Sequence, residues 1–117
     1  MNTRDVGVLG EKIAGLFLAL KGYQIVARNY RYAGREVDLI ATRGNILAAV
    51  EVKLRRSKRF GEAVEAVDAR KLARIQTALA NVIARSDGRY EPRIDLVVID
   101  VDANSGDMTV RHLEAVR

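Results

Sequence analysis

The sequence predicts an α/β protein in which helices flank a mixed β-sheet, with the elements in the order αβββαββ. Apolar residues recur at helical spacing in two segments, residues 5–21 and 68–86. Five further segments alternate between apolar and polar residues or are continuously apolar, as strands are. The Gly-Asn pair at 44–45 provides a tight turn between two of them. With 117 residues, 49% of them hydrophobic, one domain over residues 1–117 is expected.

The first helix is expected over residues 5–21, and Gly22 ends it. On a helical wheel Glu11 falls far from the apolar stripe, on a face made of small and apolar residues. Something is therefore expected to approach that face closely. The stripe, which makes this helix amphipathic, consists of Val6, Leu9, Ile13, Leu16, Phe17 and Leu20.

The remaining elements follow from alternation, turns and caps. A Gly-Asn centre suits a type II′ hairpin because glycine adopts the positive φ of the first central position. Residues 54–61, which read KLRRSKRFG when started at Lys53, indicate a basic connection. Asp68 is a good N-cap for the second helix, which ends at Asp87-Gly88. Residues 94–101 are apolar on both faces apart from two aspartates, which indicates a buried central strand. The strands are expected at 23–32, 35–42, 46–53, 94–101 and 108–113.

The composition excludes several kinds of chemistry. The absence of cysteine rules out zinc fingers, iron–sulfur sites, cysteine nucleophiles and disulfide frameworks. The single histidine, His112, and three serines outside any G-x-S-x-G setting argue against a Ser/His/Asp triad. Carboxylate, lysine and arginine chemistry remains. The apolar stretch 13–20 is too short to span a bilayer, so a cytoplasmic protein is expected.

The charge is basic and unevenly distributed. Lys and Arg number 20 against 15 Asp and Glu, which gives a net charge of +5. Residues 1–59 carry 12 basic and 5 acidic side chains, whereas residues 60–117 carry 8 and 10. Fifteen of the basic residues are arginine, whose planar fork matches phosphate oxygens. The first half is therefore expected to face a polyanion. The alternative is that a high-GC genome uses arginine codons for residues of a solvated surface.

Four charged residues of the predicted hairpin are expected to form one cluster. If the hairpin turns symmetrically about residues 44–45, Asp38 lies opposite Glu51, and Glu36 lies opposite Lys53. Two bare carboxylates about 4 Å apart repel by roughly 4 kcal/mol at an effective dielectric constant near 20. The pair therefore needs a proton, a basic partner or a metal ion. A structural ion pair made by Lys53 and a metal site are the two alternatives.

The metal alternative implies a particular chemistry. Hard oxygen ligands without histidine or cysteine favour Mg²⁺ or Mn²⁺ over zinc. A lysine two residues from a metal-binding glutamate can orient or deprotonate a water, or stabilise the charge that develops on a phosphorane-like transition state. Divalent metal, lysine and an arginine-rich surrounding together point to phosphodiester hydrolysis.

The spacing of Asp38 and Glu51-Val52-Lys53 resembles the D…(D/E)-x-K motif of the PD-(D/E)xK, or restriction-endonuclease-like, nucleases, whose core is αβββαβ. More specific strings extend the similarity over nearly the whole chain. In their order they resemble the YraN-type family of small bacterial proteins, which is similar to archaeal Holliday-junction resolvases. The strings are GxxGE (7–11), GYQIVARNYR (22–31), GREVDLIA (34–41), VEVKLR (50–55), FG (60–61), the helix with Lys71, and RIDLVVID (93–100).

The resemblance implies roles for individual residues. Asp38 and Glu51 would bind the metal with the Val52 carbonyl, and Lys53 would activate water or stabilise charge. Glu11 matches the first-helix glutamate that completes the catalytic site in resolvase-like members and is a further metal ligand by resemblance. Glu36 matches the glutamate before the aspartate of the family and supports the site.

The function expected on these grounds is that of a Mg²⁺- or Mn²⁺-dependent nuclease acting on DNA, with branched or structured DNA among the substrates implied by resemblance. The alternatives are a non-catalytic nucleic-acid-binding protein that keeps the fold, and a small interaction module. A homodimer is also implied by resemblance. The residues expected to contact nucleic acid, rather than to form a solvated charge run, are Arg28, Arg31, Arg35, Arg55, Arg56, Lys58, Arg59 and Lys71.

Overall fold

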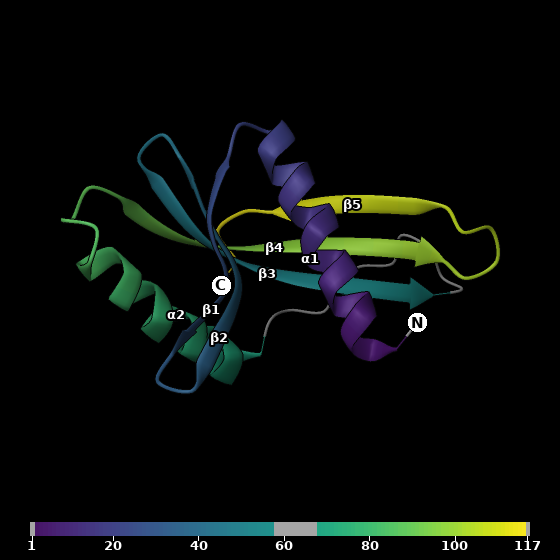
Figure 1. The fold of residues 1–117 in the computed structure, drawn as a ribbon, viewed down its shortest axis with the longest axis horizontal. Coiled ribbons are helices and arrows are strands. Elements are labelled where there is room, and N and C mark those ends of the chain that lie inside the picture. The colour runs from purple at the N-terminus through teal and green to yellow at the C-terminus, as the bar shows by residue number, and fades with distance from the viewer. Residues whose placement is uncertain (1, 58–67, 117) are drawn as a thin grey trace.

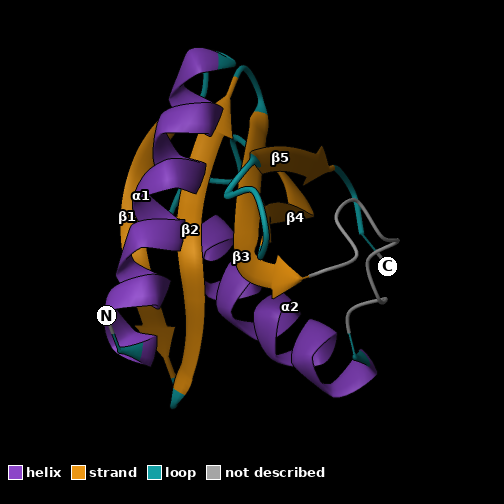
Figure 2. Cartoon of the chain, turned by 90° about the vertical axis from the view of Figure 1, so that its right-hand side faces the viewer, coloured by secondary structure: helices purple, strands orange, loops and turns teal. Residues whose placement is uncertain are grey.

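A five-stranded mixed sheet forms the centre of the structure, with one helix on each face (Figures 1 and 2). The computed structural model describes residues 2–57 and 68–116. The predicted order αβββαββ is confirmed, and its first six elements form the αβββαβ core of the restriction-endonuclease-like fold. The elements are α1 (Thr3–Leu20), β1 (Gln24–Tyr32), β2 (Arg35–Arg43), β3 (Ile46–Ser57), α2 (Ala69–Ala84), β4 (Glu91–Asp102) and β5 (Met108–Leu113).

The strands lie side by side in chain order, and only β3 and β4 pair in parallel. The other neighbours are antiparallel, so short turns connect them, whereas α2 lies in the crossover from β3 to β4. β3 is longer than expected, because it continues beside β4 as far as the pair Ser57↔Asp102. Residues 54–57, which the sequence placed in a basic connection, therefore belong to the strand, and that prediction was wrong.

The predicted hairpin turn, the end of the first helix and the N-cap of the second helix are confirmed. Gly44 has φ +57°, whereas Asn45 is not among the residues with positive φ, as a type II′ turn requires. Gly22 follows α1 with φ +92°, a conformation that suits the end of a helix. Asp68 caps α2 by accepting a hydrogen bond of 2.7 Å from the Arg70 backbone N–H.

The helix α1 buries its small residues rather than its apolar stripe. Its buried positions are Gly10, Ala14, Gly15 and Leu18, whereas much of the predicted stripe, including Leu16, faces solvent. A Cβ atom on Gly10 would lie 3.5 Å from Leu54 Cβ, and one on Gly15 would lie 3.0 Å from Arg28 Nη1. The small residues thus let the helix lie close to the sheet. The sheet is what approaches the face that carries Glu11.

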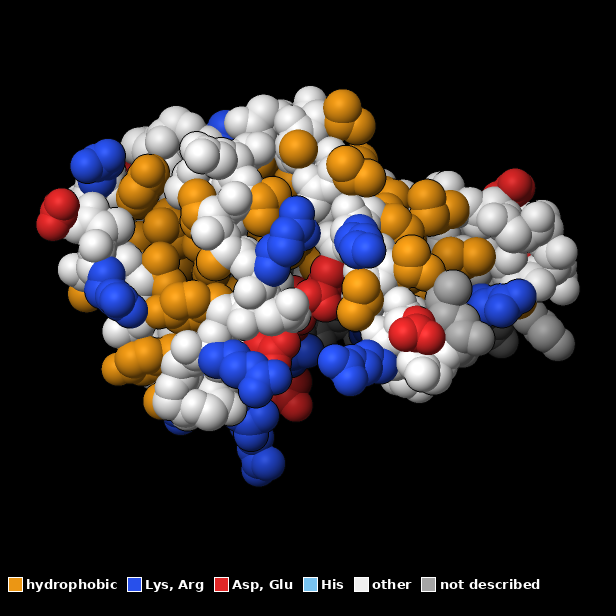
Figure 3. Space-filling model, viewed as in Figure 1, with side chains coloured by type: hydrophobic (Ala, Val, Ile, Leu, Met, Phe, Trp, Pro, Cys, Tyr) orange, Lys and Arg blue, Asp and Glu red, His pale blue; other side chains and the backbone are white. Residues whose placement is uncertain are grey.

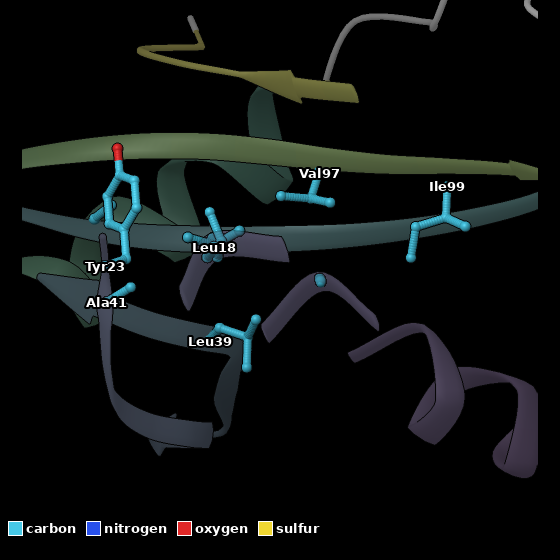
Figure 4. Packing of buried hydrophobic residues seen from close by; sticks show 9 residues of the cluster. Leu18, Tyr23, Leu39, Ala41, Val97 and Ile99 are labelled. Atoms are coloured by element: carbon cyan, nitrogen blue, oxygen red, sulfur yellow. The ribbon is translucent and has the colours of Figure 1, made fainter. Parts of the chain in front are cut away.

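Two apolar clusters hold the sheet, one on each face. The first packs Leu18 of α1 against residues such as Leu39, Val97 and Ile99 (Figure 4). The second packs Ile75 and other residues of α2 against the opposite face of β2, β3 and β4. Because both faces of the middle strands are packed, the backbone of β2 and β3 is held firmly where their charged residues begin.

In the part of the chain that the structure describes, neither helix has the length and apolar character needed to cross a membrane.

Candidate functional site

The strands β2 and β3 separate at Asp38. Their pairing follows the predicted register from Arg43↔Ile46 to Leu39↔Val50, which confirms the expected hairpin up to that pair. Beyond it, Asp38 Oδ2 accepts a hydrogen bond of 2.8 Å from the backbone N–H of Val52. The Asp38 side chain thus accepts the hydrogen bond that the backbone of a neighbouring strand would otherwise accept from Val52. The direct cross-strand pair of Asp38 and Glu51 expected from the sequence does not form.

The β1–β2 hairpin, which carries Asp38, is irregular. Asn29, opposite Asp38 on β1, has φ +50°, and the register between β1 and β2 shifts between Ile25 and Ala27. Such irregularities increase the twist of a strand pair. Figure 1 shows the result, since β1 and β2 run steeply across the direction of β3. The Asp38 carboxylate therefore lies where the sheet opens.

Asn29 also connects two carboxylates and was not predicted as a site residue. Its side-chain amide donates to Glu11 Oε1 at 2.5 Å and to Glu36 Oε1 at 3.1 Å. Arg31 forms an ion pair of 3.3 Å with Glu36, which follows from their opposite positions on β1 and β2. The signal in the sequence was an asparagine inside a strand pattern, because asparagine tolerates positive φ better than most residues.

The acidic pair, defined as Asp38 and Glu51, is poorly compensated. Glu51 is only 5% exposed, and its Oε2 lies 2.9 Å from Lys71 Nζ. Its Oε1 is buried and has no hydrogen-bond partner among the described residues. Burial and the negative charge of Glu51 raise the pKa of Asp38 to about 6, despite the hydrogen bond from Val52. A further positive charge at this place would stabilise both carboxylates.

The donor atoms fit a hard divalent cation. The buried Glu51 Oε1 accepts no hydrogen bond from the part of the chain that the structure describes, and Asp38 supplies a second carboxylate. In an extended strand the C=O of Val52 points to the same side as its N–H, which is the side of Asp38. No group of three or more acidic or histidine side chains suited to a metal occurs among residues 2–57 and 68–116. Two carboxylates suit Mg²⁺, which retains several waters.

Lys53 and Lys71 are two of the lysines with a predicted role in the site. Lys53 is exposed on β3, two residues from Glu51 and therefore on the same sheet face. The expected pair of Lys53 with Glu36 does not form, because β2 has left β3 at that point. Lys71, which is expected to contact nucleic acid, forms an ion pair with Glu51, and this hydrogen bond raises the pKa of the lysine above its usual range.

Glu11 reaches the neighbourhood of the acidic pair from α1. Its carboxylate accepts the Asn29 hydrogen bond, and its charge contributes to the raised pKa of Asp38. A hollow of about 340 Å³ lies beside it, between α1 and the β1–β2 hairpin. Acidic and basic side chains share its wall, which is lined by Arg4, Gly7, Val8, Glu11, Asn29, Arg31 and Glu36.

The basic residues after Lys53 lie on different sides of the sheet. Arg55 donates to Asp100 at 2.8 Å, and this hydrogen bond lowers the pKa of the buried Asp100 carboxyl, with a contribution from Arg111. Arg55 thus compensates a buried charge, and its expected contact with nucleic acid stays a prediction. Because side chains alternate along a strand, Arg56 lies on the other face, beside the apolar residues Val6 and Leu54. The predicted contacts at Lys58 and Arg59 lie outside the described residues.

Three other predicted nucleic-acid contacts lie on the β1–β2 hairpin. The guanidinium of Arg28 lies against Gly15 of α1, and Arg35 donates to the Ala33 carbonyl at 3.1 Å. The Arg31 side chain is 78% exposed. In Figure 3, acidic side chains lie near the middle of the face with Lys and Arg side chains around them. This face thus combines an acidic centre with a basic surround.

The fold and the site define a small α/β protein of restriction-endonuclease-like topology. Its acidic pair, with Glu51 buried and Asp38 half-buried, lies where the second and third strands separate. The chain belongs to the uncharacterised protein family UPF0102, whose model matches residues 10–99. The resemblance to the YraN-type family is thereby confirmed. Similar UPF0102 proteins occur in Beutenbergia cavernae (40% identical, 99% of each chain covered) and Symbiobacterium thermophilum (42% identical, 84% of each). Another, from Renibacterium salmoninarum, is 42% identical over 81% of each chain.

Proposed function

We propose that this protein is a metal-dependent nuclease that hydrolyses phosphodiester bonds in DNA, with branched or structured DNA among its candidate substrates. The observation that carries the proposal is the Glu51 carboxylate. It is almost completely buried, and one of its oxygens has no hydrogen-bond partner within residues 2–57 and 68–116. It also lies beside a second carboxylate whose ionisation is disfavoured. Structural carboxylates are normally fully paired, as Asp100 is in this protein.

In such a reaction the residues of the site would have different roles. Asp38, Glu51 and the Val52 carbonyl would hold Mg²⁺ or Mn²⁺, with Glu11 as a further acidic group nearby. When bound, the ion would supply Lewis-acid stabilisation of the phosphate and lower the pKa of water. Lys53 lies on the same face of the strand as Glu51 and can orient the attacking water or stabilise charge developing on the phosphate.

The basic surround suits the DNA backbone. Arg31 is exposed beside the hollow that contains Glu11, and Arg4 lines the same hollow from α1. Arginine can bind phosphate oxygens bidentately, and such contacts position a nucleic acid without reading its sequence. The proposal also places the protein in the cytoplasm, together with DNA.

We expect cleavage to depend on Lys53. In the presence of Mn²⁺, Lys53→Ala should cleave DNA about 10²-fold more slowly than wild type, because the ammonium group acts on the transition state. DNA affinity should change little. The unfolding temperature should also stay the same, because Lys53 is exposed and has no ion pair with another described residue. Labelled linear, flapped and four-way DNAs, with an EDTA control, test cleavage; fluorescence anisotropy tests binding.

The outcomes separate the three functions. Binding without cleavage of any of these DNAs by the wild type would contradict the enzyme and favour the non-catalytic nucleic-acid-binding alternative. Neither binding nor cleavage would favour an interaction module. A large loss of stability in Lys53→Ala would show that Lys53 is a structural partner of the acidic pair.

A homodimer is part of the proposal, because two symmetric sites can cut two strands. The side chains of Leu16 and Leu20 project from the outer face of α1 and are 68% and 88% exposed, respectively. An apolar groove of about 360 Å³ lies beside the N-terminal half of the same helix, lined by Leu9, Ile13 and other apolar residues. Antiparallel packing of two α1 helices would place the exposed leucines of each helix beside the groove of the other.

We expect the double variant Leu16→Glu, Leu20→Glu to be monomeric at protein concentrations where the wild type is a dimer. Charged side chains on this face would oppose burial, while the exposed positions leave the fold intact. Size-exclusion chromatography with light scattering measures the mass. Val26→Glu, an exposed apolar position on β1, is the control and should remain dimeric. A monomeric wild type would contradict the dimer.

A further inference from the structure

The ammonium group of Lys71 lies against the Glu51 carboxylate of the acidic pair. Its Nζ lies 2.9 Å from Glu51 Oε2, and the Lys71 side chain is 58% exposed, whereas that of Glu51 is 7% exposed. Lys71 belongs to the first turn of α2, which Asp68 caps. The helix therefore presents a positive charge at the place where the buried carboxylate meets solvent.

This single positive charge leaves the acidic pair incompletely compensated. Asp38 accepts only the backbone N–H of Val52 among its hydrogen bonds from described residues, and Glu51 Oε1 accepts none. Lys71 acts on both carboxylates, since its charge also favours ionisation of Asp38. The lysine thus occupies the position of a metal cation, at a site whose carboxylate oxygens could bind more positive charge.

We propose that Lys71 is an internal counter-cation that occupies the acidic pair in the metal-free protein, is displaced from Glu51 when a divalent cation binds, and thereby sets the metal affinity. This inference rests on the metal site of the proposed function. An ammonium and a divalent ion sharing the Glu51 carboxylate repel each other at short range. Lys71 can leave without a change in α2, because its four-carbon stem is flexible and largely exposed.

The test compares Mn²⁺ binding by variants at constant pH. Lys71→Met removes the charge and keeps an unbranched apolar stem. It should bind Mn²⁺ about fivefold or more tightly than wild type in calorimetric titrations and in electron paramagnetic resonance of free Mn²⁺. Its unfolding temperature should be lower without metal and should rise further when Mn²⁺ is added.

Two variants control for charge. Lys71→Arg restores a positive charge at the same place and should return the Mn²⁺ affinity to the wild-type range. Lys12→Met removes the same net charge from an exposed position on α1 and should leave the affinity unchanged. A gain confined to Lys71→Met identifies a local effect, because a change in net charge alone would appear in Lys12→Met as well.

Equal or weaker Mn²⁺ binding by Lys71→Met, with a wild type that binds, would overturn the counter-cation role and leave the metal site intact. Lack of binding by both proteins would overturn the role and the metal site together. If Lys71→Met fails to fold, as judged by circular dichroism, Lys71→Gln is measured in its place, and the same gain in affinity is expected of it.

Discussion

Asp38→Asn is expected to abolish metal-dependent cleavage and, at the same time, to stabilise the metal-free protein. Loss of one of two carboxylate ligands should reduce the cleavage rate by on the order of 10³-fold and remove the thermal shift caused by Mn²⁺. The amide oxygen of asparagine can still accept the hydrogen bond from Val52. The variant therefore removes a poorly compensated charge and keeps the local structure.

The stabilisation should depend on pH in a definite direction. The pKa of Asp38 in the folded protein is about 6, above its usual value of 3.8, because of burial and the charge of Glu51. The folded protein thus loses stability relative to the unfolded chain as pH rises from about 4 to about 6, and the loss is complete above that range. Asp38→Asn should gain roughly 1 kcal/mol at pH 8, or about 4 °C, and little near pH 4.

Thermal unfolding in EDTA, followed by circular dichroism at the two pH values, measures this difference. Glu91→Gln removes one negative charge from an exposed position at the start of β4 and should have no such effect. Destabilisation of Asp38→Asn at pH 8 would show that the carboxylate is a structural group, and it would argue against the acidic pair as a place reserved for a cation.

Asp95→Ala is expected to have the largest effect on stability. Asp95 is completely buried on β4 and accepts hydrogen bonds of 2.8 Å from Arg93 Nε, Arg93 Nη2 and His112 Nε2, and one of 3.1 Å from the Ala115 N–H. Removal of one partner from a buried charged network costs about 3–5 kcal/mol. We expect the unfolding temperature to fall by about 12–20 °C.

His112 has a structural role in this network, which is why the sequence assigned it no place in the candidate site. Lys21 Nζ lies 2.6 Å from Nδ1 of His112, so the ring accepts a hydrogen bond there and donates from Nε2 to Asp95. The histidine side chain is 1% exposed. It ties the end of α1 to β4 and β5 and lies within the structural core rather than at the acidic pair.

The same network predicts the acid sensitivity of the wild type. Burial opposes ionisation of Asp95, but hydrogen bonds from His112 and Arg93 outweigh it and lower its pKa below the usual value. The pKa of Asp100 is also lowered, chiefly by Arg55. Their stabilisation is present above pH 4 and is lost as pH falls through the lowered values. As the pH falls below 4, the free energy of unfolding should therefore decrease less for Asp95→Ala than for wild type.

Asp107→Ala, an exposed aspartate in the turn before β5, is the matched control and should unfold like the wild type. Metal binding by Asp95→Ala should be unchanged below its unfolding temperature, because Asp95 has no contact with the acidic pair among its hydrogen bonds. An Asp95→Ala protein that unfolds within a few degrees of the wild type would contradict the structural role of the network.

Much of the candidate site could be predicted because it depends on local regularities. The turn at Gly44-Asn45 sets the register of the hairpin, and the observed pairs follow it up to Leu39↔Val50. Alternation along β3 then places Glu51 and Lys53 on one face. The exact partners could not be predicted in this way, because a symmetric hairpin contains no information about where two strands separate.

The sequence by itself determined the element order, the hairpin turn, the caps and the family. These properties depend on residues close together in the chain, or on a pattern of residues shared with relatives. The tertiary structure alone decided which face of α1 is buried, where β2 separates from β3, and which lysine reaches Glu51. The reason is physical: close packing favours the small face of α1, strand twist adds up along the sheet, and a buried carboxylate takes the nearest cation in space, whatever its distance in sequence.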